Sequence, residues 1–406
     1  MALQTSGTIS LDQIHVEVGG SSGSAVTVND SDVRGLIDKS SGATMSFNEW
    51  YGASNLPPPF FNYIQYAGTG NNGSTHSITT GLNISGDGGM IMIANLTDSD
   101  GAWAFDTTRG AGQGIHPVRF SSNYNAPNPS NGGNYTISSM NAFTTTGFTV
   151  TGYDSDINNY PYNNEGNGFD NQATSFKVTS EVFGMTNWNG NSDVNTPSLN
   201  TTTVSHSLGV VPEMMWIKDY GGGFGHWICY HKNLPSGHGV AMSANISNGG
   251  NTATNSGESG RSYFNGAPTS TQVKLGTSGS TNRNTGSYMA YLFASKQDVA
   301  KVGSYVGNGS SQTIDCDFST GAQYVMIRNI TTSSTVERRW LEYVAKDGFV
   351  AGNERKRYFS AHYSDVTNVD EVDPDNSGFI VNTSVADNVN ISGNTYIFYA
   401  VAVNNT

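Results

Sequence analysis

The chain has 406 residues, of which 36% are hydrophobic and 13% charged, and its formal net charge is −13. Because binding to a phosphate backbone needs clustered Lys and Arg, this balance argues against a nucleic-acid partner. The length exceeds that of one ordinary domain and predicts about two to four.

The composition predicts an all-β protein. Gly, of which there are 49, and the frequent Asn, Ser and Thr disfavour long helices, whereas aromatic and β-branched residues suit strands. The longest apolar run, YIFYAVAV, has the length of a strand, so we expect no membrane insertion. The opening MALQTSGTIS lacks the pattern of a secretory signal, and Cys229 and Cys316 are too few for a disulfide framework. We therefore expect synthesis in a reducing cytoplasm and stability without crosslinks.

The N-terminal segment differs from the rest of the chain. SLDQI, from Ser10, and SFNEWYG, from Ser46, each place Ser three residues before Gln or Glu, which is the capping-box pattern of a helix start. Asn29–Ile37 also offers capping residues ahead of an apolar pair. The three prolines at 57–59 cannot continue a helix and favour a stiff, extended spacer. These signals predict a small module of short helical turns over residues 1–56.

This segment is also where the chain resembles a known family. The run GTISLDQIHVEVGG…VNDSDVRGLI…GATMSFNEWYGAS resembles the N-terminal segment of tail-fibre and baseplate proteins of tailed bacteriophages, especially phages of marine cyanobacteria and other marine bacteria. The resemblance implies an attachment module that docks on other tail or baseplate proteins through residues 1–54. It also implies a homo-oligomer, with a trimer favoured, although no heptad repeat specifies one. The candidate attachment residues are Leu11, Ile14, Val33, Leu36, Phe47, Trp50 and Tyr51.

The remainder of the chain contains three copies of one pattern. Each copy has an apolar run that ends in Ile (Ile93, Ile217 and Ile327), followed by a polar loop and a Trp (Trp103, Trp227 and Trp340). An aromatic segment with a Gly-Asn turn precedes each run. After it come an alternating segment (GFTVTG, TQVKLG and GFIVNT) and a closing apolar segment (SFKVTSEVFG, SYMAYLFASK and TYIFYAVAV). The same order of features in all three copies predicts three tandem domains built around an equivalent buried strand and Trp.

Each copy has the size of one β-sandwich or jelly-roll-like domain. We predict β-domain 1 over residues 57–184, β-domain 2 over 185–301 and β-domain 3 over 302–406. The apolar runs MIMI and YIFYAVAV are typical of strands buried on both faces, whereas TQVKLG alternates and should have one solvated face.

The polar loops differ between copies and contain aromatic residues. Exposed aromatic rings provide flat faces for sugars, and Asn and Asp supply hydrogen bonds to hydroxyl groups. The candidate glycan-contact residues are Tyr124, Tyr135, Tyr160, Tyr162, Tyr220 and Phe224. The alternative is that these rings pack the loops against their own domain, and the sequence leaves both interpretations open.

Sequence motifs for chemistry are sparse, and we expect no catalytic residues, no metal site and no cofactor. His226, His231 and His238 do not have zinc-ligand spacing. Asp373 and Asp375 begin a calcium-loop pattern, but Ser384 occupies the position of its closing Glu, so a plain turn is favoured and calcium binding is left open. The basic stretches ERRW, at 337–340, and NERKRY, at 353–358, are interpreted as solvated or contact surface.

We therefore expect a structural, non-enzymatic virion protein located at the tail or baseplate. Its N-terminus would dock on the tail, and its tandem β-domains would project to contact a host surface glycan or protein. The alternative is a capsid decoration, head fibre or tail connector without a receptor role. A polysaccharide depolymerase is a distant third, since no pair of carboxylates stands out.

Overall fold

The computed structural model of the chain describes most of its residues. The described ranges are 3–37, 39–53, 59–68, 75–95, 102–115, 135–136, 140–151, 170–192, 201–221, 227–242, 261–284, 286–331, 340–345, 349–352, 354–359, 366–382 and 389–403. They form two compact units, Met1–Pro58 and Pro59–Thr406. The predicted division at residue 56 lies two residues before this boundary.

The first unit is a small helical module with its own core. Its helices are α1 (Leu11–Glu17), α2 (Ser31–Gly35) and the 3-10 helix η1 (Phe47–Trp50). Both predicted capping boxes form: Ser10 pairs with Gln13 at the start of α1, and Ser46 with Glu49 at the start of η1. The side chains of Leu3, Ile14, Val33 and Trp50 are buried together. Local capping and one small apolar cluster thus define this module.

The second unit consists of strands, with two single-turn helices among its described residues, and confirms the predicted all-β fold. Its first third contains β1 (Phe61–Ala67), β2 (Thr75–Thr79), α3 (Ile84–Asp87), β3 (Gly89–Asn95), β4 (Ala102–Asp106), β5 (Gln113–Gly114), β6 (Tyr135–Thr136), β7 (Met140–Phe143), β8 (Gly147–Thr151) and β9 (Asp170–Lys177). The second contains β10 (Phe183–Asn189), β11 (Thr202–Ser205), β12 (Met214–Asp219), β13 (Trp227–His231), β14 (Val240–Ala241), β15 (Gln272–Leu275), α4 (Gly279–Asn282) and β16 (Ser287–Phe293). The last contains β17 (Ala300–Val306), β18 (Gln312–Asp315), β19 (Ala322–Asn329), β20 (Leu341–Val344), β21 (Glu354–Tyr358), β22 (Val366–Val369), β23 (Val372–Asp375), β24 (Gly378–Val381) and β25 (Thr395–Ala402).

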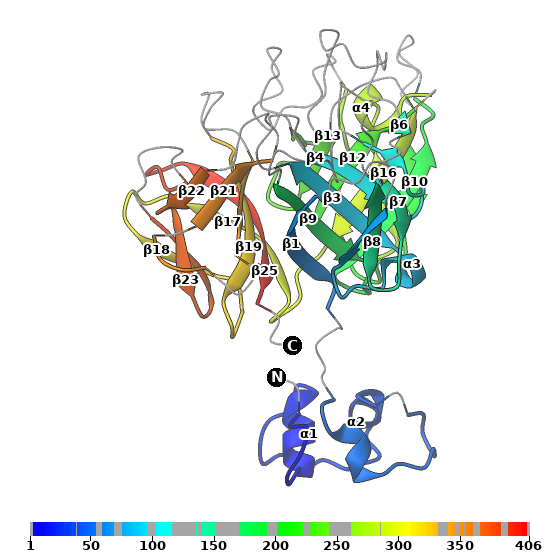
Figure 1. Ribbon diagram of the computed structural model, residues 1–406, viewed down its shortest axis with the longest axis vertical. Helices are drawn as coiled ribbons and strands as arrows, with labels where there is room; N and C mark the ends of the chain where they lie inside the picture. Colours follow the sequence, from blue (N-terminus) through cyan, green and yellow to red (C-terminus); the bar gives the residue numbers. More distant parts are fainter. Residues whose placement is uncertain are drawn as a thin grey trace. The chain divides into compact units, whose positions relative to one another are not determined.

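These strands repeat one topology three times (Figure 1). The larger sheets have the strand orders β1-β9-β3-β4, β10-β16-β12-β13-β14 and β17-β25-β19-β20-β21-β22. The smaller sheets are β2-β8-β7, β11-β15 and β18-β24-β23. A separate apolar core accompanies each pair of sheets. The unit therefore contains three β-sandwiches, called sandwich 1, 2 and 3 in chain order, and the face of each larger sheet that carries its core is called the inner face.

The predicted boundaries between the three domains fall inside strands. Residue 184 lies within β10 and residue 301 within β17, because SFKVTSEVFG and the segment after Phe293 do not continue as single strands. Each contains a tight turn, closed by the bridges Thr179↔Phe183 and Lys296↔Ala300. At the centre of these turns Glu181 has φ 65° and Asp298 has φ 58°.

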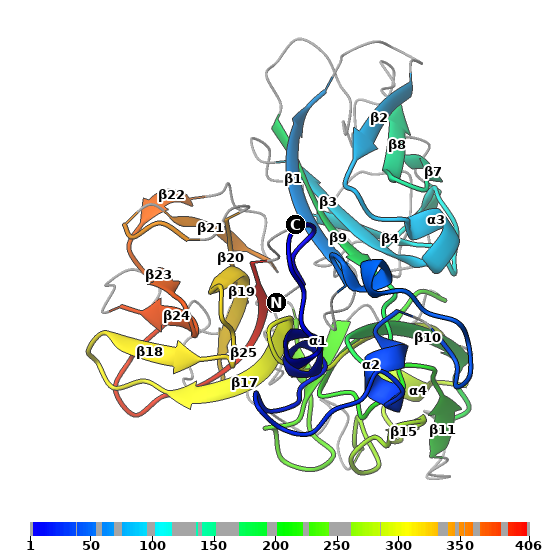
Figure 2. The same cartoon turned by 90° about the horizontal axis from the view of Figure 1, so that it is seen from below.

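The outer faces of the three larger sheets pack against one another around a common centre. Figure 2 shows the three sandwiches as three lobes around this centre. Aromatic ring pairs join every combination of sandwiches: Phe176–Phe293 (5.6 Å between centroids), Phe293–Tyr399 (4.9 Å) and Phe61–Tyr324 (5.1 Å). This packing explains why β3 and β25 are apolar on both faces, as their sequences predicted. The arrangement is a pseudo-threefold within one chain.

The three Trp residues of the repeated pattern are not equivalent, contrary to the prediction. Trp103 pairs with Ile93 itself and belongs to the inner core of sandwich 1. Trp227 pairs with Lys218, one residue beyond the equivalent Ile217, and is therefore on the opposite face of its sheet. Trp340 directly precedes Leu341, the partner of Ile327, and shares the orientation of Trp227. A shift of one residue moves a strand side chain to the other face, and sequence spacing alone does not detect it.

Candidate functional site

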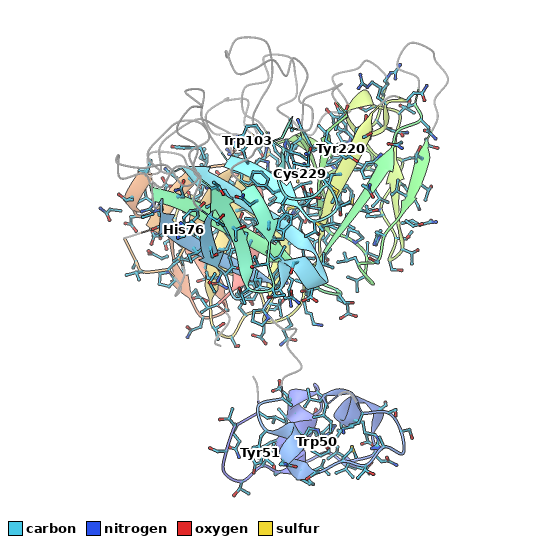
Figure 3. The ribbon with its side chains drawn as sticks, turned by 45° about the vertical axis from the view of Figure 1, so that its right-hand side comes forward. Trp50, Tyr51, His76, Trp103, Tyr220 and Cys229 are labelled. Carbon is cyan, nitrogen blue, oxygen red and sulfur yellow. The ribbon has the colours of Figure 1, made fainter. Side chains whose placement is uncertain are left out.

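Most of the candidate attachment residues hold the first unit together. Ile14, Val33 and Trp50 are buried in its core, Leu11 and Leu36 pack against them, and the indole nitrogen of Trp50 donates to the carbonyl of Val33 (3.1 Å). Figure 3 labels Tyr51 and Trp50 in this unit. The hydroxyl group of Tyr51 donates to the carbonyl of Gly7, which lies in the loop before α1. Ile14, Val33 and Trp50 thus form the core of the module, and Leu11, Leu36 and Tyr51 are half-buried around it.

Exposed apolar residues of the first unit define what we call the module surface. Phe47 is 46% exposed, and its ring lies 5.5 Å from that of Trp50. Val16 and Val28 are 47% and 37% exposed. Among the described residues of this unit these three are the exposed large hydrophobic side chains. Of the seven predicted attachment residues, Phe47 alone is largely solvent-accessible.

The structure tests few of the predicted glycan-contact residues. Tyr124, Tyr160, Tyr162 and Phe224 lie outside the described residues, and of Tyr135 only the backbone is described, in β6. Tyr220 directly follows β12 and is half-buried. The six residues are thus not shown to form one site.

Tyr220 belongs to a polar contact between sandwiches 1 and 2. The guanidinium group of Arg109 lies 5.9 Å from the centre of its ring. Arg109 also donates through Nε to Asp106 (2.6 Å), and the hydroxyl group of Tyr291 donates to the same carboxylate (2.8 Å). Burial, together with this carboxylate, raises the pKa of Tyr291 well above its ordinary value, so the hydroxyl group stays a donor. Tyr220 therefore contributes to packing between sandwiches, in line with the second interpretation of the loop aromatics.

The basic stretch at 353–358 was interpreted as solvated or contact surface, but Glu354, Lys356 and Arg357 are buried, and Arg355 and Tyr358 are half-buried. Residues 337–339 of the other basic stretch lie outside the described residues. Lys356, on β21, pairs with Glu371 at 2.9 Å, and both side chains are at most 2% exposed. Arg357 pairs with Glu342 of β20 at 2.7 Å. The hydroxyl group of Tyr343 also donates to Glu371. Glu342 lies on the adjacent strand, and Glu371 lies in the loop between β22 and β23. The sequence around the basic residues therefore does not reveal their acidic partners.

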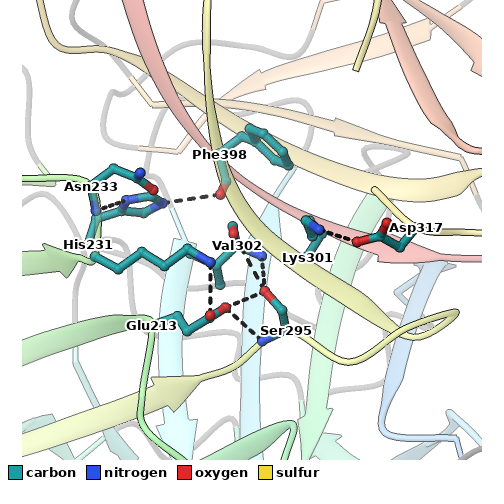
Figure 4. A network of polar contacts seen from close by, with 9 residues as sticks. Glu213, His231, Asn233, Ser295, Lys301, Val302, Asp317 and Phe398 are labelled. Atoms are coloured by element: carbon teal, nitrogen blue, oxygen red, sulfur yellow. Dashed lines mark hydrogen bonds and ion pairs between the residues drawn. The ribbon is translucent and has the colours of Figure 1, made fainter. Parts of the chain in front are cut away.

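The structure describes two of the three histidines that the sequence analysis considered as metal ligands. His226 lies outside the described residues, and His238 contacts the carbonyl of Ser236. His231 is buried between sandwiches 2 and 3 (Figure 4). Its Nδ1 accepts from the backbone N–H of Asn233 (3.2 Å), so its Nε2 carries the proton and faces the carbonyl of Phe398 (3.4 Å). Burial lowers the pKa of His231 to about 4, which keeps the ring neutral.

The calcium-loop pattern forms a β-hairpin turn between β23 and β24. The carboxylate of Asp375 accepts from the backbone N–H (2.8 Å) and hydroxyl group (2.7 Å) of Ser377. Asp373 accepts from the side chain of Asn382 at 2.7 Å. Ser384 lies outside the described residues. Within the described ranges no group of three or more His, Cys, Asp or Glu side chains is arranged to hold a metal ion.

The inner face of sandwich 1 carries polar side chains that the sequence motifs do not mark. We call Asn62 and Tyr66 of β1, with Asn171 and Ser175 of β9, the polar row. Register places Asn62 opposite Ser175, and Tyr66 opposite Asn171. Tyr66, Asn171 and Ser175 are at most 9% exposed. These polar residues become unusual only when the three copies are compared position by position. The equivalent residues are Gly184, Trp188, Tyr288 and Leu292 in sandwich 2, and Lys301, Tyr305, Tyr396 and Ala400 in sandwich 3.

Residues 56–404 match a protein family described as a domain of unknown function, DUF7483. The match covers the second unit except for its last two residues. The chain therefore belongs to this family, and the three sandwiches are the part of the chain that the family model describes. No curated protein matches the chain. In the part of the chain that the structure describes, no helix has the length and apolarity needed to span a membrane.

Proposed function

We propose that the chain is a structural protein of a tailed-phage virion, associated with the tail fibre or baseplate. In this proposal residues 1–58 dock on another tail or baseplate protein, and the three sandwiches contact the host cell surface. The resemblance of the first 54 residues to phage tail proteins supports the assignment. The observation that carries it is the division of the chain into a small module with its own core and a separate, much larger β unit.

The topology of the sandwiches supports a division between attachment and contact. The first strand of the second unit begins at Phe61, which pairs with Phe176 near the end of β9. Tyr66, Asn171 and Asn95 lie at the opposite end of the same sheet, where β3 ends. The connections β3–β4, β12–β13 and β19–β20 leave the three sandwiches from this same end of each sheet. Segments that vary between copies on constant scaffolds are typical of recognition surfaces.

The module surface supports docking of the first unit through apolar contact. Phe47, Val16 and Val28 are exposed although the unit has a complete small core. Each side chain of this size that is removed from water contributes roughly 1.5–3 kcal/mol to association. A Phe47→Ser variant should therefore fold and lose incorporation into particles, whereas Trp50→Ser should unfold the module.

Gold labelling of intact particles tests the proposal, with an antibody raised against residues 60–406. We expect label at the tail end and a block of adsorption when the antibody is bound. Label on the head would replace the proposal by capsid decoration. Label at the tail without any effect on adsorption would indicate a connector. Absence from particles would refute a virion role.

A further inference from the structure

The polar row of sandwich 1 leaves buried hydrogen-bonding groups without partners. Among the described residues no hydrogen-bond partner exists for Oδ1 of Asn62, the hydroxyl oxygen of Tyr66, both side-chain amide atoms of Asn171 and Oγ of Ser175. An unsatisfied buried polar group costs about 1–3 kcal/mol, and native proteins contain few. Five such atoms on the inner face of two paired strands therefore need an explanation.

The other two sandwiches provide an internal control for this position. In sandwich 2, Trp188 and Tyr288 stack with their centroids 5.4 Å apart, and in sandwich 3, Tyr305 and Tyr396 stack at 4.9 Å. The polar atoms of these rings are satisfied by nearby backbone groups. Trp188 donates to Thr281, Tyr288 to Gly279 and Tyr305 to Val389, while Tyr396 accepts from the N–H of Ile391.

Sandwich 1 departs from this arrangement at both ends of the row. Asn171 replaces the second ring of the stack, so Tyr66 contacts the rings of His76 (5.9 Å) and Phe148 (6.1 Å) instead. At the other end Asn62 and Ser175 replace the pairs Gly184–Leu292 and Lys301–Ala400. Because side chains on one face of a strand recur every second residue, the four side chains line the same inner face over about 14 Å.

Asn62 lies at the solvent-facing edge of the sheet, and Tyr66, Asn171 and Ser175 are buried behind it. β1 is an edge strand, and Asn62, Ile64 and His76 are only half-buried although they lie on the inner side of the sandwich. The row consists of amide groups, hydroxyl groups and the ring of Tyr66, and none of its four side chains is charged. Amides and hydroxyl groups that both donate and accept, next to an aromatic ring, match the hydroxyl groups and apolar ring faces of a neutral sugar.

We infer that the inner edge of sandwich 1, formed by β1 and β9, binds a neutral saccharide through Asn62, Tyr66, Asn171 and Ser175. This inference rests on the proposed host-contact function and names the ligand class and the sandwich that binds it. Sandwiches 2 and 3 lack the site because aromatic stacks and apolar or charged side chains fill the equivalent positions.

The experiment is saturation-transfer-difference NMR on the full chain, with D-glucose, D-galactose, D-mannose and N-acetyl-D-glucosamine as probes. We expect a saturable signal from at least one sugar. Asn171→Tyr, which installs the residue of the other two sandwiches, should weaken that binding about tenfold, as should Tyr66→Phe. Asn187→Ala, on the exposed side of β10, is the matched control and should bind as the unaltered chain does.

Tyr66→Phe also separates binding from folding. Because the variant only removes an unpaired hydroxyl group, its thermal unfolding midpoint without sugar should equal or exceed that of the unaltered chain. No signal from any of the four sugars would overturn the inference, and so would a signal that Asn171→Tyr and Tyr66→Phe leave unchanged. If particles are labelled at the tail but no sugar binds, or the variants do not change sugar binding, the inference fails and the proposed function remains supported. If the protein binds sugar through these residues but is absent from particles, the saccharide site is supported and the virion role is refuted.

Discussion

Single buried side chains connect the sandwiches and make the fold sensitive to pH. His231 lies between sandwiches 2 and 3, next to a network in which Glu213 pairs with Lys232 (2.8 Å) and accepts from the N–H of Ser295 (3.0 Å) (Figure 4). Burial lowers the pKa of His231 to about 4, against the ordinary value of 6.5. Between these pH values the unfolded chain takes up a proton that the folded chain does not, so stability falls as the pH falls.

We predict that His231→Gln removes this part of the pH dependence. Gln retains a donor toward the carbonyl of Phe398 and does not titrate. Between pH 7.5 and pH 5 the unaltered chain should lose about 2 kcal/mol more stability than the variant. Urea unfolding at both pH values measures the difference. Equal losses would show that His231 is not held neutral in the folded chain.

The buried pair Lys356–Glu371 gives a second prediction at this scale. Removing one member leaves the other charge buried without compensation, which costs about 3–5 kcal/mol. Lys356→Met should therefore destabilise the chain by this amount, and adding Glu371→Gln should restore more than half of it. The amide oxygen that this second substitution introduces can still accept from Tyr343, which donates to Glu371 in the structure. A double variant no more stable than the single one would contradict a direct charge interaction.

At the scale of elements, two equivalent turns join the sandwiches. Glu181 and Asp298 occupy the left-handed region, which costs energy for residues other than glycine, and Lys296 beside the second turn pairs with Glu181 of the first at 3.0 Å. Oδ1 of Asp298 has no hydrogen-bond partner among the described residues. The backbone N–H of Asp298 donates to the carbonyl of Asp317 (3.1 Å), so a backbone contact helps to hold the turn.

We predict that Asp298→Gly stabilises the chain by roughly 0.5–1 kcal/mol, because glycine adopts this conformation without strain. Asp298→Ala should destabilise it by about 1 kcal/mol, since Ala lacks the tolerance of Asp for positive φ. Denaturant midpoints of the two variants provide the comparison. If both shifts have the same sign, the side chain and not the backbone determines the effect.

The sequence predicted the elements better than their orientation. Features that depend on local sequence patterns are found in the structure. They are the apolar runs of β3 and β25, the alternation of buried and exposed residues in β15, and both capping boxes. Strand register and residues distant in the chain determine the other features. These are the orientation of Trp103 toward the core, the charged partner of Lys356 and the residue at which β9 ends. The polar row was missed for a related reason: its residues are ordinary in isolation and become unusual only beside their equivalents in the other sandwiches.

At the scale of the whole second unit, three sandwiches share one aromatic centre. Phe176 contacts the rings of Phe293 and Trp216 in sandwich 2 and of Tyr324 in sandwich 3. The outer faces of the larger sheets are therefore covered within the chain. A homotrimer, which the resemblance implies, then has to be held by other residues, and the module surface is the candidate within the described ranges.

We predict that residues 59–406 behave as a single chain in solution. Because the contacts that join the three sandwiches are intramolecular, the unfolding midpoint should not depend on protein concentration over a hundredfold range. Light scattering with size-exclusion chromatography gives the mass of this fragment and of the full chain. A trimeric full chain with a monomeric fragment would assign trimer contacts to the first unit, whereas a trimeric fragment would contradict the prediction.

The covalent joining of the sandwiches has a consequence for how the protein changes over generations. In an assembly of three identical chains every substitution appears three times, so a change that benefits one contact is imposed on all. Here each sandwich is encoded separately, and a substitution such as the Asn at position 171 alters one third of the unit while the other two keep their packed aromatic pairs. Two sandwiches can thus keep their packing while substitutions accumulate in the third.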